Sequence, residues 1–251
     1  MLRRLGSMEK ELSIVVPVYN EEDNILPLTR EVRQAFENSG YDYELVFVDD
    51  GSSDGTWAKI GQAKALEPRV RGLRHDKNAG QSAALWTGIQ YTTSPLVATL
   101  DGDLQNDPAD LPRLLSELQG HDFVCGVRAQ RKDSWLRRVS SKAARRARRM
   151  ALKVDFCDTG CAVRVFKRSA LKGLFPFNGL HRFMPVLVHT AGGKTKEVPI
   201  NHRARVAGKS KYGLQNRLWR GIADLLAMAW YQKRRIGDIP FTEIQEQRHA
   251  A

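Results

Sequence analysis

Three clusters of acidic and polar residues hold the side chains with the clearest chemical potential in this sequence. In the strongest cluster, Asp101 and Asp103 are separated by one glycine and followed by Gln105. Carboxylate and amide oxygens are the ligands that Mg²⁺ and Mn²⁺ prefer, and these ions usually bridge substrate phosphates as well. We expect Asp101, Asp103 and Gln105 to bind such an ion. The competing interpretation is a solvated acidic turn.

Two further clusters could bind the rest of a phosphorylated ligand. One covers residues 17–22 and the other covers residues 49–55. The carboxylates of Glu21 and Asp50 can accept hydrogen bonds from a nucleobase or from ribose hydroxyls, and Tyr19 can pack against a base. A helix cap in the first cluster and a tight turn in the second are the structural alternatives, and both are compatible with ligand contacts.

Alternating strands and helices are predicted for the first half of the chain, and they bring the clusters together. Apolar runs predict strands over 12–18, 43–48, 70–74, 96–100 and 123–127, and helical spacing predicts helices over 24–38, 56–66, 80–91 and 107–118. Strands that are apolar throughout and separated by helices indicate a parallel sheet covered on both faces. Ligands of such α/β sheets bind at the carboxyl ends of the strands. The clusters follow the first, second and fourth strands, so we expect them to line one crevice.

The charge is divided unequally between the two halves of the 251-residue chain. Residues 1–127 carry 12 Lys and Arg against 20 Asp and Glu, a balance of −8, whereas residues 128–251 carry 28 against 8, a balance of +20. An acidic half can hold a metal, and a basic half can meet phosphates or an anionic membrane. The apolar content of 42% argues against a disordered chain. The three cysteines lack the spacing of a zinc site.

The basic half contains two predicted amphipathic helices. The first covers 131–153 with nine Lys and Arg within 131–149, and the second covers 214–231 and is followed by three basic residues at 233–235. Short strands are expected within 156–166 and at 195–200. Basic amphipathic helices can lie on anionic lipid, although plain packing on the sheet is the competing interpretation. No run of 18 apolar residues is present, so we expect no membrane span.

Taken together, the three clusters resemble the signature motifs of the GT-A family 2 glycosyltransferases. The resemblance rests on residues 17–21, 49–56 and 101–108, and it extends over about residues 12–230. It is to the branch of dolichyl-phosphate mannose synthases and polyprenyl-phosphate glycosyltransferases. It implies a GT-A (Rossmann-like) α/β fold, mostly parallel with helices on both faces, a nucleotide-sugar donor, Mg²⁺ or Mn²⁺, and inversion at the anomeric carbon. GDP-mannose and UDP-hexoses both remain open as donors.

The resemblance also divides the site residues into groups. It implies that the nucleotide is bound by Pro17, Tyr19, Glu21, Asp50 and Asp101, and the metal by Asp101, Asp103 and Gln105. It implies that the acceptor and diphosphate oxygens are bound by Arg128, Arg164, Arg182, Arg205, Ser210 and Lys211. Asp103, Arg128 and Arg205 are the expected catalytic residues. The stretch 161–163 departs from the usual family pattern, so the resemblance constrains the role of Arg164 least.

The acceptor implied by the resemblance is a polyprenyl phosphate, either dolichyl or undecaprenyl phosphate. A phosphate monoester is already largely ionised at neutral pH, because its second pKa is about 6. Its oxygen can therefore attack the anomeric carbon without a general base. Catalysis would rest on the metal charge, on a basic clamp around the diphosphate, and on the orientation of attack.

The expected organisation is a flexible segment at 1–11, a catalytic domain over 12–213, a membrane-interface helix over 214–235 and a flexible tail over 236–251. Reduced cysteines and the lack of a signal peptide favour a cytoplasmic enzyme, peripheral on the cytoplasmic face of an anionic membrane. A homo-oligomer is compatible with this organisation. The alternatives are a family 2 transferase with a soluble or saccharide acceptor, and a nucleic-acid-binding protein. The latter leaves the three acidic clusters unexplained.

Overall fold

The framework of the molecule is a seven-stranded sheet with strand order β3-β2-β1-β4-β6-β5-β7. The computed structural model describes residues 10–128, 145–201, 203 and 214–235. The strands are β1 (Leu12–Val18), β2 (Tyr43–Asp49), β3 (Val70–Arg74), β4 (Leu96–Thr99), β5 (Phe123–Arg128), β6 (Arg164–Lys167) and β7 (Thr195–Ile200). All neighbouring pairs are parallel except the two that involve β6. The predicted mostly parallel sheet is confirmed.

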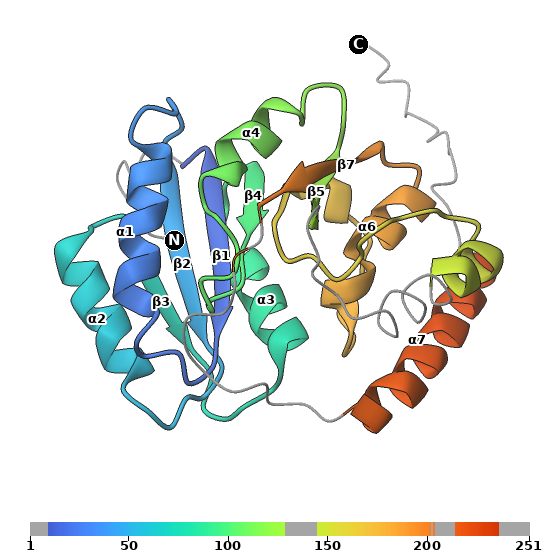
Figure 1. Cartoon of the computed structure of the whole chain (residues 1–251), viewed down its shortest axis with the longest axis horizontal. Coiled ribbons are helices and arrows are strands. Elements are labelled where there is room, and N and C mark those ends of the chain that lie inside the picture. The colour runs from blue at the N-terminus through green and yellow to red at the C-terminus, as the bar shows by residue number, and fades with distance from the viewer. Residues whose placement is uncertain (1–9, 129–144, 202, 204–213, 236–251) are drawn as a thin grey trace, which may run out of the picture.

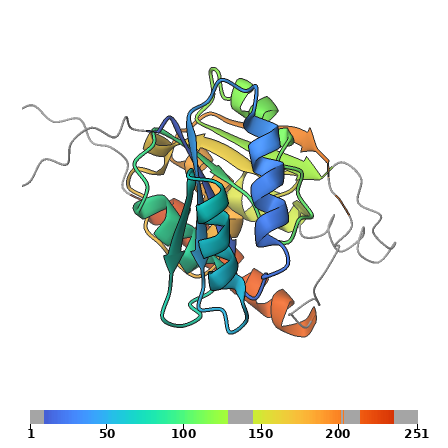
Figure 2. The same cartoon turned by 90° about the vertical axis from the view of Figure 1, so that its left-hand side faces the viewer.

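Helices cover both faces of this sheet (Figure 1). They are α1 (Ile25–Phe36), α2 (Thr56–Leu66), α3 (Gln81–Gln90), α4 (Asp110–Ser116), α6 (Leu180–Thr190) and α7 (Leu214–Arg234), with a 3₁₀ turn η1 (Arg168–Leu171). Apolar residues of α1, α2 and α4 pack on one face, and those of α3, α6 and α7 pack on the other. Figure 2 shows α1 and α2 side by side on their face. Successive side chains of a strand point to opposite faces, so strands that are buried almost throughout, such as β1 and β2, contribute to both cores.

Two elements differ from the sequence-based expectation. Helix α4 begins at Asp110, three residues after the predicted start at 107, because the Asp107 side chain accepts a hydrogen bond from the N–H of Ala109 and makes a turn of the residues before the helix. Helix α6 was not predicted at all. Seven of its eleven residues are buried and Pro185 lies within it, and an internal proline ordinarily argues against a helix.

The ligand edge of the sheet, as we call it, is formed by the carboxyl ends of the parallel strands and by the amino end of β6. The reversed strand β6 begins at Arg164, which lies opposite Thr99 of β4 and opposite Cys125 of β5. The antiparallel direction therefore places the first residue of β6 where its neighbours end. Arg164 comes within two residues of the Asp101 turn across the sheet, although 63 positions separate them in the chain.

The long helix α7 lies at the opposite end of the molecule from α1 and α2 (Figure 1). Met228 is buried on its inner side, whereas Ile222, Leu226 and Trp230 are exposed. Among the described parts of the chain, no helix has the length and apolar character that a membrane crossing requires. Of the other predicted amphipathic helix, residues 145–152 are helical, and residues 131–144 lie outside the described residues, as do 1–9 and 236–251.

Candidate active site

The Asp101 turn is held in place by close packing and by internal hydrogen bonds. A side-chain carbon at Gly102 would lie 2.6 Å from Cγ1 of Val18, so the turn sits directly on the end of β1. Leu104 adopts a left-handed backbone conformation with φ of 58°, which turns the chain sharply after Asp103. The Asp101 carboxylate accepts a hydrogen bond from Nε2 of Gln81 at 2.8 Å. Packing therefore fixes the orientation of the predicted metal-binding turn.

The donor set of this turn fits a hard divalent cation. Asp101 and Asp103 are both partly accessible and lie one residue apart after β4. Among the described residues, no group of three or more His, Cys, Asp or Glu side chains is arranged to hold a metal by itself. Mg²⁺ and similar ions are commonly held by one or two carboxylates together with substrate phosphates, so a carboxylate pair is the expected donor set. The amide of Gln105 stays a predicted third ligand.

The loops after β1 and β2 are tied together by reciprocal hydrogen bonds. The N–H of Asn20 donates to Oγ of Ser52 at 2.9 Å, and the N–H of Ser53 donates to Oδ1 of Asn20 at 2.9 Å. Asn20 has a positive φ of 53°, a conformation that asparagine tolerates better than most residues. Helix α1 is capped at Asn24 instead, and Nδ2 of Asn24 donates to Glu21. The two predicted nucleoside-binding loops therefore form one unit.

Asp50 organises the segment that leads into α3. Its carboxylate accepts hydrogen bonds from the backbone N–H groups of Ala79 and Gly80 at 2.9 and 2.7 Å, and it lies 2.8 Å from Nδ1 of His75. The side chain is almost fully buried. Three donors from within the chain thus satisfy this carboxylate, which fixes the start of α3 and with it Gln81. Contact of Asp50 with a nucleoside stays a prediction.

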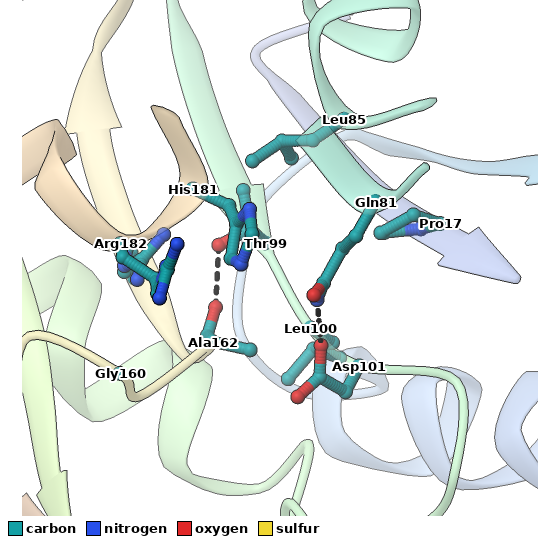
Figure 3. Close-up of a pocket in the computed structure, with 11 residues that line it drawn as sticks. Pro17, Gln81, Leu85, Thr99, Leu100, Asp101, Gly160, Ala162, His181 and Arg182 are labelled. Atoms are coloured by element: carbon teal, nitrogen blue, oxygen red, sulfur yellow. Dashed lines mark hydrogen bonds between the residues drawn. The ribbon is translucent and has the colours of Figure 1, made fainter. Parts of the chain in front are cut away.

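A pocket of about 150 Å³ opens beside Asp101 at the ligand edge. Its walls come from β1, α3, the end of β4, the start of β6 and the first turn of α6. They are formed by Pro17, Gln81, Leu85, Thr99, Leu100, Asp101, Gly160, Ala162, Arg164, His181 and Arg182. Figure 3 shows Gln81 and Pro17 on one side and His181 and Arg182 on the other, with Thr99 and Asp101 between them. The pocket therefore joins the predicted metal turn to two of the predicted phosphate-binding arginines.

Arg164 brings a buried cation to this pocket. Its side chain is 3% exposed, and it donates to the carbonyl of Thr159 and to Sδ of Met184. Its Nε has no hydrogen-bond partner among the described residues, and no carboxylate there lies within ion-pair distance of it. Burial lowers the pKa of this guanidinium from its ordinary value, and the charges of Asp101 and Asp158 offset that effect only in part. A buried charge without a close counter-ion is costly, so this geometry calls for an anionic ligand.

The first turn of α6 adds further donors to the same wall. Nε of Arg182 is buried without a partner among the described residues, while its Nη2 donates to Asp224 of α7. The Oγ of Ser82 accepts from the N–H of Gly179 and lies 2.6 Å from Nδ1 of His181. The Ser82 hydroxyl and Nδ1 of His181 therefore share a hydrogen bond whose direction depends on the tautomer of the imidazole.

His181 is a neutral imidazole at physiological pH. Burial, reinforced by the nearby charges of Arg164 and Arg182, lowers its pKa from 6.5 to about 4. A group with so low a pKa is a weak base near neutral pH. The site thus combines two cations with a neutral imidazole.

Arg128 is held next to the pocket by a two-pronged ion pair. Its Nε and Nη2 donate to the two carboxylate oxygens of Asp158 at 2.6 and 2.8 Å. Burial lowers the pKa of Arg128, but the hydrogen bonds that Arg128 donates to Asp158 outweigh this effect and leave the pKa above its ordinary value. Glu197 of β7 in turn accepts hydrogen bonds from the backbone N–H groups of Cys157 and Asp158. The loop that carries Asp158 is thereby fixed to the edge strand.

The structure brings some of the predicted site residues together in one place. Pro17, Asp101, Arg164 and Arg182 line the pocket. The negative charge of Asp101 also contributes to the raised pKa of Arg128. Arg205, Ser210 and Lys211 lie outside the described residues.

Gln81, Ser82 and the role of His181 were missed by the reasoning from sequence. The signal for Gln81 and Ser82 was their place in the first turn of a helix that starts at the ligand edge. His181 had only its position beside Arg182 as a signal, because α6 itself was not predicted.

The chain matches proteins of known sequence over most of its length. The family model for glycosyl transferase family 2 matches residues 13–175, well over half of the chain. An undecaprenyl-phosphate 4-deoxy-4-formamido-L-arabinose transferase of Aeromonas hydrophila is 36% identical over 209 residues, which cover 82% of this chain and 64% of the relative. The protein of the same description from Edwardsiella ictaluri is 37% identical over 206 residues, 81% of this chain and 63% of the relative. The chain thus spans less than two thirds of the length of these curated relatives.

Solved structures show the same fold at low sequence identity. Glucosyl-3-phosphoglycerate synthase from Mycobacterium tuberculosis, in complex with Mn²⁺ and UDP-glucose, has a TM-score of 0.66 at 20% identity, covering 89% of this chain and 79% of that one. A mannosyltransferase from Pyrobaculum calidifontis, in complex with GDP-mannose and Mn²⁺, has a TM-score of 0.60 at 20% identity, covering 93% and 67%. The expected GT-A-like fold is therefore confirmed. With the three motifs on one edge of that fold and the family model matched over residues 13–175, the chain belongs to glycosyl transferase family 2.

Proposed function

We propose that this chain transfers a sugar from a nucleotide-sugar to a polyprenyl phosphate, with inversion at the anomeric carbon. The observation that carries the proposal is the pocket in which the cations of Arg164 and Arg182 face the Asp101 turn. A phosphate monoester in this pocket would lie beside the place where a donor diphosphate meets a metal. The curated relatives named for transfer to undecaprenyl phosphate support this choice of acceptor.

The acceptor side of the site has the chemistry of a phosphate receptor. Guanidinium groups present planar sets of N–H donors that match phosphate oxygens, and the N-terminal end of a helix favours anions. Arg164 supplies a buried Nε that lacks a partner among the described residues, and α6 directs its first turn into the same pocket. We assign the phosphate oxygens to Arg164, Arg182 and the adjacent Arg128, whose pairing with Asp158 fixes its position.

The donor side would use the two loops that follow β1 and β2. Tyr19 and Glu21 stand at the end of β1, beside the pocket residue Pro17, and we assign the nucleoside to them together with Asp50. Asp101, Asp103 and Gln105 would hold Mg²⁺ or Mn²⁺, which when bound supplies positive charge to the donor diphosphate. Glycosyltransferase structures of this fold contain such ions with nucleotide-sugars, which supports the use of a metal here.

The residues of the chain account for the transfer step without a general base. The acceptor phosphate is already ionised near neutral pH, and the arginines would hold one of its oxygens toward the anomeric carbon. The low pKa of His181 keeps its imidazole neutral, so we assign it to orienting the phosphate and not to taking up a proton. The bond between the anomeric carbon and the diphosphate breaks as the new bond to the phosphate oxygen forms. The departing diphosphate would be stabilised by Arg205, Ser210 and Lys211.

Helix α7 would bring the enzyme to the membrane that contains such an acceptor. Ile222, Leu226 and Trp230 recur at four-residue intervals and are 41%, 65% and 65% exposed. Lys233 and Arg234 are exposed at the end of the same helix. An apolar stripe next to cations suits the surface of an anionic bilayer. We therefore place the enzyme peripherally, on the cytoplasmic face.

A soluble phosphorylated acceptor is the second candidate. The assignment of the pocket to a phosphate group is compatible with a soluble molecule as well as a lipid attached to that phosphate. One structural neighbour was solved in complex with phosphoglyceric acid, a soluble phosphate monoester. The membrane-facing stripe on α7 favours the lipid acceptor over this alternative.

The test is a transfer assay with the full chain, Mg²⁺ or Mn²⁺, and a panel of nucleotide-sugars that includes GDP-mannose, UDP-glucose and UDP-4-deoxy-4-formamido-L-arabinose. Undecaprenyl phosphate, dolichyl phosphate and 3-phosphoglycerate serve as acceptors in parallel. We expect metal-dependent formation of a polyprenyl-phospho-sugar from one donor. Transfer to 3-phosphoglycerate alone would replace the lipid acceptor with the soluble one, and lack of transfer from every donor would refute the proposal.

A further inference from the structure

An ion pair connects α7 with the acceptor pocket. Nη2 of Arg182, in the first turn of α6, donates to Oδ2 of Asp224, in the middle of α7. Arg182 also forms part of the pocket wall (Figure 3). The helix that we assign to the membrane surface is therefore in direct contact with a residue that we assign to the acceptor phosphate.

Arg182 needs a partner of this kind to stay in place. The N-terminal end of a helix is electrostatically positive and disfavours cations, and no acidic residue occupies the first turn of α6. Burial is the main cause of the lowered pKa of His181, and the charges of Arg164 and Arg182 both add to it. The two cations therefore act on the same imidazole. Among the described residues, Asp224 is the carboxylate that forms an ion pair with Arg182.

The position of Asp224 on α7 is itself unusual for that helix. It is the single acidic residue within Leu214–Arg234, which contains Arg217, Arg220, Lys233 and Arg234. An acidic side chain facing an anionic lipid surface would be repelled, but Asp224 points inward to Arg182 and its side chain is 21% exposed. Its place is thus explained by the pocket and not by the exposed surface of the helix.

The backbone leaves room for this contact. Gly179 precedes α6 with a positive φ of 109°. A side-chain carbon at Gly179 would come within 3.3 Å of Oδ2 of Asp224 and within 3.4 Å of Nη2 of Arg182. A glycine at this position therefore lets the two side chains meet against the backbone at the start of α6.

We propose that Asp224 is a positioning residue for acceptor binding: it fixes the guanidinium of Arg182 at the pocket and so couples the seating of α7 to recognition of the acceptor phosphate. The proposal rests on the assignment of the pocket to the acceptor. The ion pair with Asp224 restricts the Arg182 side chain to one rotamer at the pocket. Without Asp224, the side chain would sample several rotamers, and the positive end of the helix would repel its charge.

The experiment compares Asp224→Asn with the wild-type full chain. The substitution keeps the shape of the side chain and removes its charge. We expect the acceptor KM to rise about tenfold and the donor KM to change less than twofold. We expect the same rise with undecaprenyl phosphate in detergent and with a short, water-soluble prenyl phosphate. Asp224→Glu, which restores the charge, should recover most of the acceptor affinity.

The control is Asp42→Asn, because Asp42 pairs with Lys10 at the amino ends of β1 and β2, away from the ligand edge. It should leave both KM values at the wild-type level. Equal losses in donor and acceptor KM for Asp224→Asn would indicate a merely structural role and overturn the proposal. A loss confined to the long-chain acceptor would also overturn it, since Asp224 would then act through membrane binding alone.

Inorganic phosphate gives a readout that does not depend on transfer. Thermal unfolding in a phosphate titration yields the affinity of the pocket for the ion, and Asp224→Asn should weaken it about tenfold relative to wild type and to Asp42→Asn. If wild type transfers no sugar to a lipid phosphate but shows this difference, the proposed function fails and the positioning role stands. If transfer occurs but the variant equals wild type in phosphate affinity and in acceptor KM, the positioning role alone is refuted.

Discussion

Replacing Arg164 by methionine should stabilise the fold while it removes acceptor binding. The side chain is 3% exposed, its Nε has no hydrogen-bond partner among the described residues, and the charges of Asp101 and Asp158 offset its burial only in part. Methionine has a similar length and no charge, so Arg164→Met keeps the volume of the site. The fold would no longer bury a cation that the chain itself neutralises only in part.

The magnitude follows from the contacts of this side chain. Removal of a poorly compensated buried charge recovers about 3 kcal/mol, and leaving the carbonyl of Thr159 without its donor costs about 1 kcal/mol. The net gain of about 2 kcal/mol corresponds to a rise in Tm of roughly 4 to 8 °C for a domain of this size. Loss of a charge-assisted hydrogen bond to phosphate costs about 3 kcal/mol, or roughly a hundredfold in kcat/KM for the acceptor.

Thermal unfolding and steady-state kinetics measure the two effects on the same preparations. Phosphate should raise the Tm of the wild type and leave that of Arg164→Met unchanged, because ligands stabilise only the state that binds them. The matched control is Arg168→Met. Arg168 donates to the carbonyls of Ser94 and Ile89 and to Oγ1 of Thr92, away from the ligand edge. This control should lower Tm and leave the acceptor KM unchanged.

The reasoning would be refuted if Arg164→Met lowered Tm as much as Arg168→Met does. Arg164 would then be a satisfied structural residue like its counterpart. Retention of acceptor kcat/KM within threefold would equally refute the assignment of Arg164 to the phosphate, whatever the change in stability.

Three further predictions concern the neighbouring residues. His181 has a folded pKa of about 4 against 6.5 unfolded, so the unfolded chain binds the extra proton and stability falls by about 3 kcal/mol as the pH drops from 6.5 to 4. In urea unfolding, His181→Gln should lose less stability than wild type between pH 6.5 and 4. The same pH dependence of stability in both proteins would contradict the lowered pKa of His181. Gly102→Ala should cost about 1 to 3 kcal/mol, because its new methyl meets Val18; combining it with Val18→Ala should recover part of that loss in a double-mutant cycle. Asp103→Asn should abolish metal-dependent turnover at an unchanged far-UV circular dichroism spectrum, and full activity would remove Asp103 from the site.

Much of the fold was predictable because its elements have strong local signals. The first five strands are rich in apolar residues, β3 with its two arginines least so, and the helices between them show regular spacing, so the parallel core and the edge at which the motifs meet follow from pattern and topology. The same logic placed Asp101 at the end of a strand. The direction of β6 was beyond this logic, because a strand of four residues carries no mark of its orientation.

The electrostatic state of the site was not predictable from residue types. Arg164 and Arg168 are four positions apart and chemically identical, yet one has an unsatisfied Nε at a pocket and the other donates to three internal acceptors. Only the three-dimensional arrangement separates them. Asp50 gives a similar lesson, since its sequence motif suggested ligand contact and the structure shows donors from the chain around its carboxylate.

The reversal of β6 has a consequence for how such a chain can diversify. Strand β5 ends at Arg128 and β6 begins at Arg164, and both residues lie on the ligand edge. The chain between them departs from and returns to the same side of the sheet, so its length and sequence can change without shifting the register of any strand. The loops that follow β1 and β2 lie on the other half of the edge. Gly160 and Ala162 of this stretch line the pocket, so we expect its exchange to alter the acceptor side of the proposed site while the loops after β1 and β2 keep their place.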